Sequence, residues 1–276
     1  MTMTLAEDFA LRLDPALRMR RLGRVADPWQ QTVLRSKAKR RALLAARQVG
    51  KGETLTCIGL EVATSKDDAV VGVLAPGMRQ SCRLLRRIRR ALPLVAPHIE
   101  ATNNAVETLM LSNGSEIVAW PGNNADAIRG DTLDALLADE AAWIDEAAFT
   151  ATLPMLAMTD GIAVLASTPG GPEGFLFDIF NDVDDKAAGW ERTLITADDC
   201  PRYTEEMKAE LRRALGETAY ATEMLCHWRD GVDALFTREE LDRIFGIEPD
   251  PDDADLPDDD YVPLPRLQLA TSFADL

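Results

Sequence analysis

The chain has few of the residues that build disulfide frameworks, metal centres or catalytic triads. It contains only 4 cysteines and 2 histidines in 276 residues. The cysteines lack the paired spacing of a zinc site and the density of a disulfide-rich domain: Cys57, Cys82, Cys200 and Cys226. We therefore expect reduced cysteines, a reducing compartment and no structural metal. The two histidines have no nucleophile beside them that they would activate, so we expect them to pack in the core.

Long hydrophobic runs are missing as well. No run of about 18 consecutive apolar residues occurs, so neither a transmembrane helix nor a membrane partner is expected. Residues 1–13 include Glu7 and Asp8 and lack the basic-then-apolar order of a secretory signal. Apolar residues make up 46% of the chain, enough for the core of one large domain with appendages.

Charge is distributed unevenly along the chain. The formal net charge of −16 disfavours a general nucleic-acid-binding surface. Residues 248–260 hold eight acids and no base, whereas residues 79–90 hold six arginines and no acid. We expect the acidic, proline-bearing tail to be disordered. The arginine-rich segment predicts an amphipathic helix whose basic face is either solvated or in contact with a polyanion.

Short buried runs alternate with helical patterns. Buried strands are expected at 42–46, 69–74, 133–138, 162–166 and 192–196, with a hairpin of 108–111 and 115–120 around Asn113-Gly114. Helices are expected at 54–65, 79–92, 175–180, 201–228 and 238–245, with Pro93 ending the second. The alternation predicts an α/β fold with a mostly parallel sheet flanked by helices. We expect a helical lead-in at 1–26, one domain at 27–246 and the acidic tail at 247–276.

The first candidate site follows the expected strand 42–46. Gly50-Lys51 opens a helix there, which is the context of a phosphate-binding loop whose backbone N–H groups and lysine hold phosphate. Ala45 and Gly52 stand where the usual pattern has a glycine and a hydroxyl residue. On these residues alone, an ordinary glycine turn with Lys51 in solvent remains an alternative.

Two further strand ends carry polar residues. Asp139 and Glu140 follow the buried run 133–138, where adjacent carboxylates repel each other unless a cation neutralises them. We expect Asp139 to bind magnesium and Glu140 to activate water, the alternative being an ordinary helix start. Ser167 and Thr168 follow the run 162–166, where their hydroxyls either sense a γ-phosphate or form a simple turn.

Taken together, these segments resemble the ATPase domain of the large terminase subunit of tailed phages, the motor that packages DNA. The resemblance covers about residues 26–245. It rests on segments similar to the family's adenine-recognition element, deviant Walker A, Walker B with its approach, coupling motif and exit segment. They are Asp27-Pro28-Trp29-Gln30, Arg47-Gln48-Val49-Gly50-Lys51, Ile128-Arg129-Gly130 with Leu136-Leu137-Ala138-Asp139-Glu140, Ser167-Thr168-Pro169 and Gly231-Val232-Asp233-Ala234-Leu235-Phe236.

The resemblance implies a P-loop NTPase of the additional-strand, catalytic-glutamate type that uses ATP and magnesium. It implies catalytic roles for Glu140, Lys51 and Arg47. The implied nucleotide-binding residues are Trp29, Gln30, Gln48, Val49, Gly50, Lys51, Gly52 and Thr54. The resemblance also implies that Asp139 holds magnesium, with Thr54 as a second candidate because Gly52 lacks a hydroxyl, and that Ser167 and Thr168 couple hydrolysis to movement.

Three arginines are candidates for contacts outside the site. Arg129 is a candidate for a charge-neutralising or subunit-bridging role, and Arg83 and Arg87 for contacts with DNA phosphates. The alternatives are a surface salt bridge for Arg129 and a solvated helix face for the other two.

The resemblance implies an ATP-hydrolysing subunit of the phage DNA-packaging motor. Its partners would be double-stranded DNA, a portal protein and a small terminase subunit, with the chain in a homo-oligomeric ring at the procapsid portal in the host cytoplasm. The sequence ends 31 residues after Phe245, so we expect no nuclease activity from this polypeptide. Two alternatives stay open: a catalytically weak or inactive remnant or partner of a split terminase, and another nucleic-acid-dependent P-loop ATPase.

Overall fold

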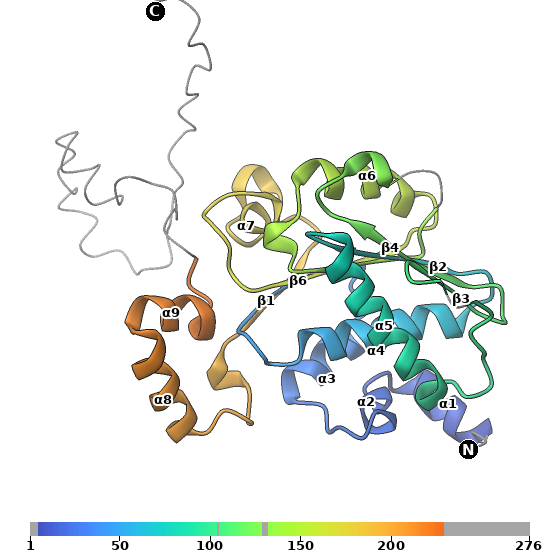
Figure 1. Cartoon of the computed structure of the whole chain (residues 1–276), viewed down its shortest axis with the longest axis horizontal. Helices are drawn as coiled ribbons and strands as arrows, with labels where there is room; N and C mark the ends of the chain where they lie inside the picture. The colour runs from blue at the N-terminus through green and yellow to red at the C-terminus, as the bar shows by residue number, and fades with distance from the viewer. Residues whose placement is uncertain (1–4, 104, 129–131, 229–276) are drawn as a thin grey trace, which may run out of the picture.

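The computed structural model describes residues 5–103, 105–128 and 132–228, which form a sheet with helices on both faces (Figure 1). The strands are β1 (Arg40–Ala45), β2 (Val70–Ala75), β3 (Thr108–Met110), β4 (Glu116–Pro121), β5 (Ala135–Asp139), β6 (Ile162–Ser167) and β7 (Glu191–Ile195). Their order across the sheet is β3-β4-β2-β5-β6-β1-β7. All neighbouring pairs are parallel except β3 with β4.

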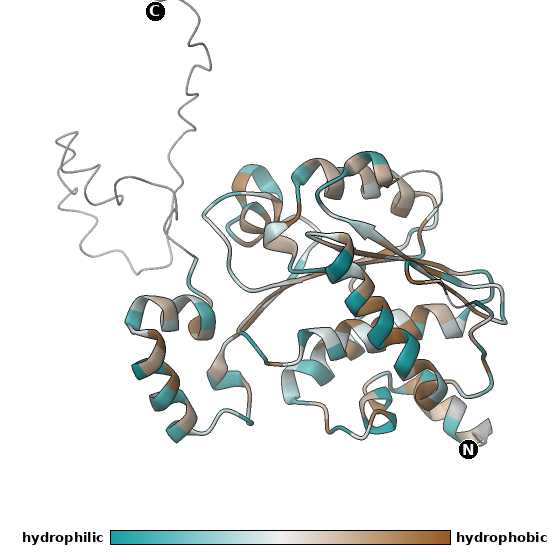
Figure 2. Cartoon of the chain, viewed as in Figure 1, coloured by the Kyte–Doolittle hydropathy of each residue, from teal (hydrophilic) through white to brown (hydrophobic). Residues whose placement is uncertain are grey.

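The central strands are buried on both faces, which explains why they occur as continuous apolar runs in the sequence. In β1, β2 and β6, every residue after the first is buried. The strands accordingly form a hydrophobic layer between the helices (Figure 2). The predicted mostly parallel sheet is confirmed, as is the hairpin, in which Gly114 takes a positive φ of 82° and Met110 pairs with Glu116.

The helices form two layers around the sheet. Helices α3 (Pro28–Arg35), α4 (Lys51–Ser65) and α5 (Met78–Val95) lie on one face, and α6 (Glu146–Ala157) and α7 (Phe175–Phe180) lie on the other (Figure 1). Two N-terminal helices, α1 (Leu5–Leu13) and α2 (Leu17–Arg21), lie on the side of α4 and α5. Helices α8 (Glu205–Leu215) and α9 (Glu217–Leu225) follow β7. No helix in the described ranges is long and apolar enough to cross a membrane.

Four short 3₁₀ turns complete the described secondary structure. They are η1 (Ala125–Ala127), η2 (Ala141–Trp143), η3 (Val183–Asp185) and η4 (Ala197–Asp199). Two expectations about helix ends need correction. Pro93 does not end its helix, because α5 continues to Val95 while its apolar side stays packed on the sheet. The helix expected over 201–228 is two helices, which meet at Gly216 where φ is 75°.

Candidate nucleotide-binding site

Three strand ends meet at one edge of the sheet. Strands β1 and β5 both pair with β6, and the register aligns Leu44 with Ser167 and Asp139 with Ala166. The loop after β1 and the two carboxylates after β5 therefore flank the end of β6. Ligands bind at this carboxyl edge in open α/β sheets, so the topology brings together the three motifs that the sequence places far apart.

The loop between β1 and α4 has the backbone of a phosphate-binding turn. Gln48 has a φ of 57°, and Gly50, at the start of α4, has a φ of 105°, where a side chain would be strained. Lys51 is only 8% exposed, and its Nζ donates to the carbonyl oxygens of Ala45 (3.1 Å) and Ala46 (3.3 Å). The alternative that leaves Lys51 in solvent is therefore wrong.

A cavity of about 890 Å³ opens over this loop. Eight of the residues expected at the nucleotide line it: Arg47, Gln48, Gly50, Lys51, Gly52, Asp139, Glu140 and Thr168. The Lys51 ammonium thus shares one cavity with both carboxylates. Burial lowers the pKa of Lys51, while the charges of Glu140 and Asp139 oppose that shift.

The two carboxylates are held differently. Burial, and then the neighbouring charge of Glu140, raise the pKa of Asp139 from 3.8 to about 6, whereas Lys51 acts to lower it. Asp139 Oδ1 accepts a hydrogen bond from the backbone N–H of Glu140 at 3.1 Å. Glu140 itself has a left-handed φ of 52° and precedes η2. The alternative predicted an ordinary helix start here, but the carboxylates are followed by one short 3₁₀ turn.

The two hydroxyl side chains after β6 make different contacts. Thr168 lines the cavity, and its Oγ1 lies 3.5 Å from Oε2 of Glu140. Ser167 is fully buried, and its Oγ accepts a hydrogen bond from the backbone N–H of Ala142 at 3.1 Å. Thr168 therefore contacts Glu140 within the cavity, while Ser167 ties β6 to the turn that follows the carboxylates.

Of the eight implied nucleotide-binding residues, four do not line the cavity, namely Trp29, Gln30, Val49 and Thr54. Trp29 packs in the core and Val49 is fully buried. Gln30 is buried too, and its side chain is used within the protein: Oε1 accepts from Asp27 N, and Nε2 donates to Gly50 O and Thr54 Oγ1. Gln30 thus supports the loop from behind, and base recognition by its amide stays a prediction.

Thr54 is the clearest departure from expectation. Its side chain is fully buried, and its hydroxyl donates to the Gly50 carbonyl oxygen at 3.2 Å, one helical turn back. It does not line the cavity. The structure therefore does not bring Thr54 into position as the substitute magnesium ligand for the missing hydroxyl of Gly52.

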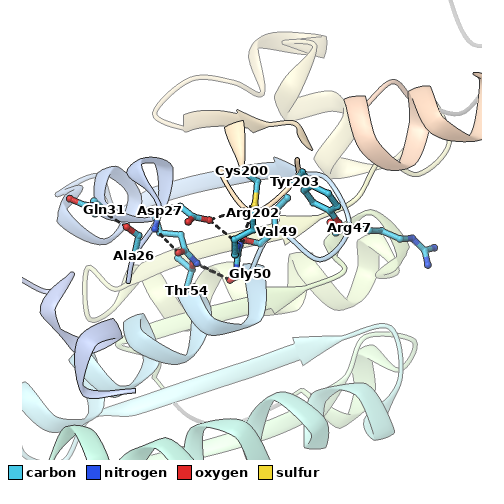
Figure 3. A network of polar contacts seen from close by, with 11 residues as sticks. Ala26, Asp27, Gln31, Arg47, Val49, Gly50, Thr54, Cys200, Arg202 and Tyr203 are labelled. Carbon is cyan, nitrogen blue, oxygen red and sulfur yellow. Dashed lines mark hydrogen bonds and ion pairs between the residues drawn. The ribbon is translucent and has the colours of Figure 1, made fainter. Parts of the chain in front are cut away.

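Arg202 is one of the cavity residues that the sequence did not single out. Arg202, between η4 and α8, lines the cavity and donates to Asp27 Oδ2 at 2.9 Å and to the Val49 carbonyl oxygen (Figure 3). The sulfur of Cys200 lies 3.3 Å from the same Nη2. Arg202 thus joins the segment after β7 to the loop and to the start of α3. No spacing rule connects it to either, because the contact depends on tertiary folding.

Arg47 is placed at the outer end of this network. Its guanidinium forms an ion pair with Glu223 of α9 and is turned away from Gly50 (Figure 3). The backbone of Arg47 is held as well, since its N–H donates to Glu223 O at 3.0 Å and its carbonyl accepts from the Tyr203 hydroxyl at 2.9 Å. In this conformation Arg47 anchors α9 to the loop.

Other arginines line the same cavity. Arg83 and Arg87 of α5, considered above for DNA contacts, both line it, as do Arg24 and Glu53, which the sequence did not single out. Glu53 pairs with Arg87 at 3.0 Å and with Arg24 at 3.7 Å. Arg129, the exit segment 231–236, the helix expected at 238–245 and the acidic tail lie outside the described residues.

The four cysteines lie in the interior of the described structure. Cys57, Cys82, Cys200 and Cys226 are all free and buried. Within the described ranges, no group of three or more His, Cys, Asp and Glu side chains is arranged to hold a metal ion.

Comparison with known proteins identifies the family. The family model described as "Terminase large subunit, T4likevirus-type, N-terminal" matches residues 42–243. The large terminase subunit of Thermus phage G20c is 28% identical over 166 residues, which cover 53% of this chain and 34% of that protein. The subunit of Thermus virus P23-45 gives the same values. The match spans about a third of the length of these relatives.

Solved structures share the fold. The large terminase ATPase domain of Thermus phage P74-26 has a TM-score of 0.64 at 22% identity, covering 76% of this chain and 97% of that one. The large terminase of a thermophilic bacteriophage in complex with ADP has a TM-score of 0.63 at 16% identity, covering 73% and 53%. Because the family model covers well over half of the sequence, the chain belongs to the family of T4likevirus-type terminase large subunits, whose N-terminal region it matches.

Proposed function

We propose that this chain binds and hydrolyses ATP as the motor ATPase of phage DNA packaging. The observation that carries the proposal is the shared cavity, in which buried Lys51 at the start of α4 faces the Asp139–Glu140 pair. Backbone N–H groups at a helix start, a lysine and a carboxylate pair are what a nucleoside triphosphate requires. A related terminase has been solved with ADP and with ATP-gamma-S, which supports ATP as the ligand.

Magnesium fits the donor set of the cavity. Asp139 ends β5 with a carboxylate whose Oδ1 accepts a hydrogen bond from Glu140 N, and burial together with the charge of Glu140 raises its pKa to about 6. One protein carboxylate completed by phosphate oxygens and water is a common magnesium arrangement. When bound, the ion would neutralise charge on the phosphates. Asp139 is the residue that would hold it.

The remaining roles follow from position. Lys51 places a positive charge where the outer phosphates would lie, while the loop N–H groups hold them in line. We assign to Glu140 the role of orienting and deprotonating the attacking water. We assign to Thr168, whose Oγ1 lies 3.5 Å from Glu140 Oε2, the role of linking the state of that carboxylate to β6. Arg47 joins the loop to α9, so movement of one affects the other.

The family supports a proposal for the wider assembly. We propose that the chain works on double-stranded DNA in a homo-oligomeric ring, with a portal protein and a small terminase subunit, at the procapsid portal in the host cytoplasm. Membership of the terminase large-subunit family supports this assignment. Arg83 on the exposed side of α5 remains a candidate for DNA contact.

Magnesium-dependent ATP hydrolysis, measured with and without double-stranded DNA, tests the proposal. We expect turnover that DNA stimulates, and loss of turnover in Lys51→Ala with the fold retained. Turnover that is the same in the native chain and in Lys51→Ala would contradict the assignment of this cavity.

One observation favours a second function. Gly52 supplies no hydroxyl and Thr54 is buried away from the cavity, so the magnesium ligand set is smaller than in the usual loop. A subunit that binds nucleotide but turns it over weakly, and acts with a partner in a split terminase, fits this feature. Tight ATP binding without hydrolysis in the native chain, with or without DNA, would select it.

A further inference from the structure

The missing hydroxyl at position 52 coincides with an arginine that occupies the same space. Gly52 follows Lys51 in the first turn of α4, beside Arg87 of the neighbouring helix α5. A Cβ built on Gly52 would lie 2.8 Å from Nη1 and 3.1 Å from Cζ of Arg87. Any side chain at position 52 would therefore displace this guanidinium. The glycine leaves room for the arginine where the usual motif has its hydroxyl.

Arg87 is held in this place by a specific contact. Its Nη1 lies 3.0 Å from Oε1 of Glu53, the residue after Gly52. The same carboxylate oxygen is 3.7 Å from Nη2 of Arg24, so one acid fixes two arginines at the mouth of the cavity. Both arginines line the cavity together with Lys51. A single carboxylate leaves the pair of guanidinium groups with an excess positive charge, which suits a polyphosphate.

We propose that Arg87 is a nucleotide-binding residue of this chain, whose guanidinium contacts the outer phosphates of ATP from the space that Gly52 leaves open. The proposal rests on the proposed function, since it assigns a ligand of the same cavity. Arginine offers paired donors that match phosphate oxygens. It would supply positive charge directly to the phosphates, where the missing hydroxyl would have supplied a magnesium ligand.

Two substitutions test the proposed contact between the Arg87 guanidinium and the phosphates. Arg87→Ala removes the guanidinium, and Gly52→Ser displaces it. The displaced atoms are the far end of a flexible side chain, so Gly52→Ser should leave the fold intact. Arg86→Ala is the matched control, because Arg86 is an exposed arginine of the same helix that does not line the cavity.

The contact of Arg87 with the nucleotide is tested by equilibrium binding of ATP-γ-S, measured by calorimetry in EDTA and again in magnesium. In EDTA we expect Arg87→Ala to weaken binding by about tenfold or more, as for loss of a charge-assisted hydrogen bond, and Arg86→Ala to bind like the native chain. Gly52→Ser should weaken binding to a similar extent. The double variant should be no weaker than Arg87→Ala alone, because both changes remove one contact.

Other outcomes overturn the proposal in recognisable ways. If Arg87→Ala binds ATP-γ-S like the native chain, or if the two substitutions are additive, Arg87 does not contact the nucleotide. If Arg87→Ala weakens binding of double-stranded DNA and leaves ATP-γ-S binding unchanged, the arginine belongs to a DNA-contacting surface. If the native chain binds no ATP-γ-S even in magnesium, the proposed function itself fails.

Discussion

Asp139→Asn should stabilise the nucleotide-free chain while removing the proposed magnesium ligand. Burial and the charge of Glu140 raise the folded-state pKa of Asp139 to about 6, against 3.8 for an unperturbed carboxyl. The difference is roughly two pKa units, and each unit corresponds to about 1.4 kcal/mol. At neutral pH the ionised carboxylate therefore lowers the free energy of unfolding by about 3 kcal/mol. Asparagine keeps the shape and can still accept the hydrogen bond from Glu140 N without this charge.

The pH dependence gives the sign of the effect. Because the folded-state pKa lies above the unfolded one, the folded chain binds the proton more tightly, and the penalty develops as pH rises from about 4 to about 6. Below this window both states are protonated, and above it the penalty is complete. Urea unfolding of native chain and variant across pH 4 to 7.5 should show a stability difference near zero at the acid end and about 3 kcal/mol at pH 7.5. A variant no more stable than native at pH 7.5, or a difference independent of pH, would refute the reasoning.

Two other substitutions test how the loop is supported. Arg202→Ala leaves the buried carboxylate of Asp27 without its ion pair and should lower the free energy of unfolding by about 1–3 kcal/mol. The control Arg213→Ala, on exposed α8, should change it by less than about 0.5 kcal/mol, and equal losses in urea unfolding would contradict the role of Arg202. Gly50→Ala should weaken both stability and ATP-γ-S binding, because a Cβ at φ 105° would also meet a side-chain amide nitrogen at 2.8 Å. Gly189→Ala is the control. This residue has a φ of 77°, but a Cβ on it would meet no atom within 4 Å, so the variant has a backbone strain of about 1–2 kcal/mol without a collision and should leave ATP-γ-S binding unchanged.

The sequence predicts the sheet and the central residues of the site for a clear physical reason. Buried parallel strands need continuous apolar runs, and the polar residues that end such runs must meet at the same sheet edge. Lys51, Asp139 and Thr168 each follow such a run, and the structure places all three on one cavity. Hydrophobic pattern and strand topology were enough to predict this arrangement.

The supporting residues could not be predicted in the same way. The contact of Arg202 with Asp27 depends on how the segment after β7 packs across the sheet. The sequence singled out Arg87 for its charge. Whether its side chain lines the cavity depends on the packing of α5 against α4. Thr54 was expected at the metal because it lies close to Lys51 in sequence. Helical geometry instead turns its hydroxyl toward the Gly50 carbonyl in the interior.

The central claim is that the cavity between the loop and the two carboxylates is a site of ATP hydrolysis. Glu140→Gln keeps the size of the side chain and removes the base, so it tests the claim with little disturbance of the fold. We expect this variant to bind ATP-γ-S in magnesium with native affinity and to lose DNA-stimulated ATP hydrolysis. Hydrolysis at the native rate in Glu140→Gln would contradict the account.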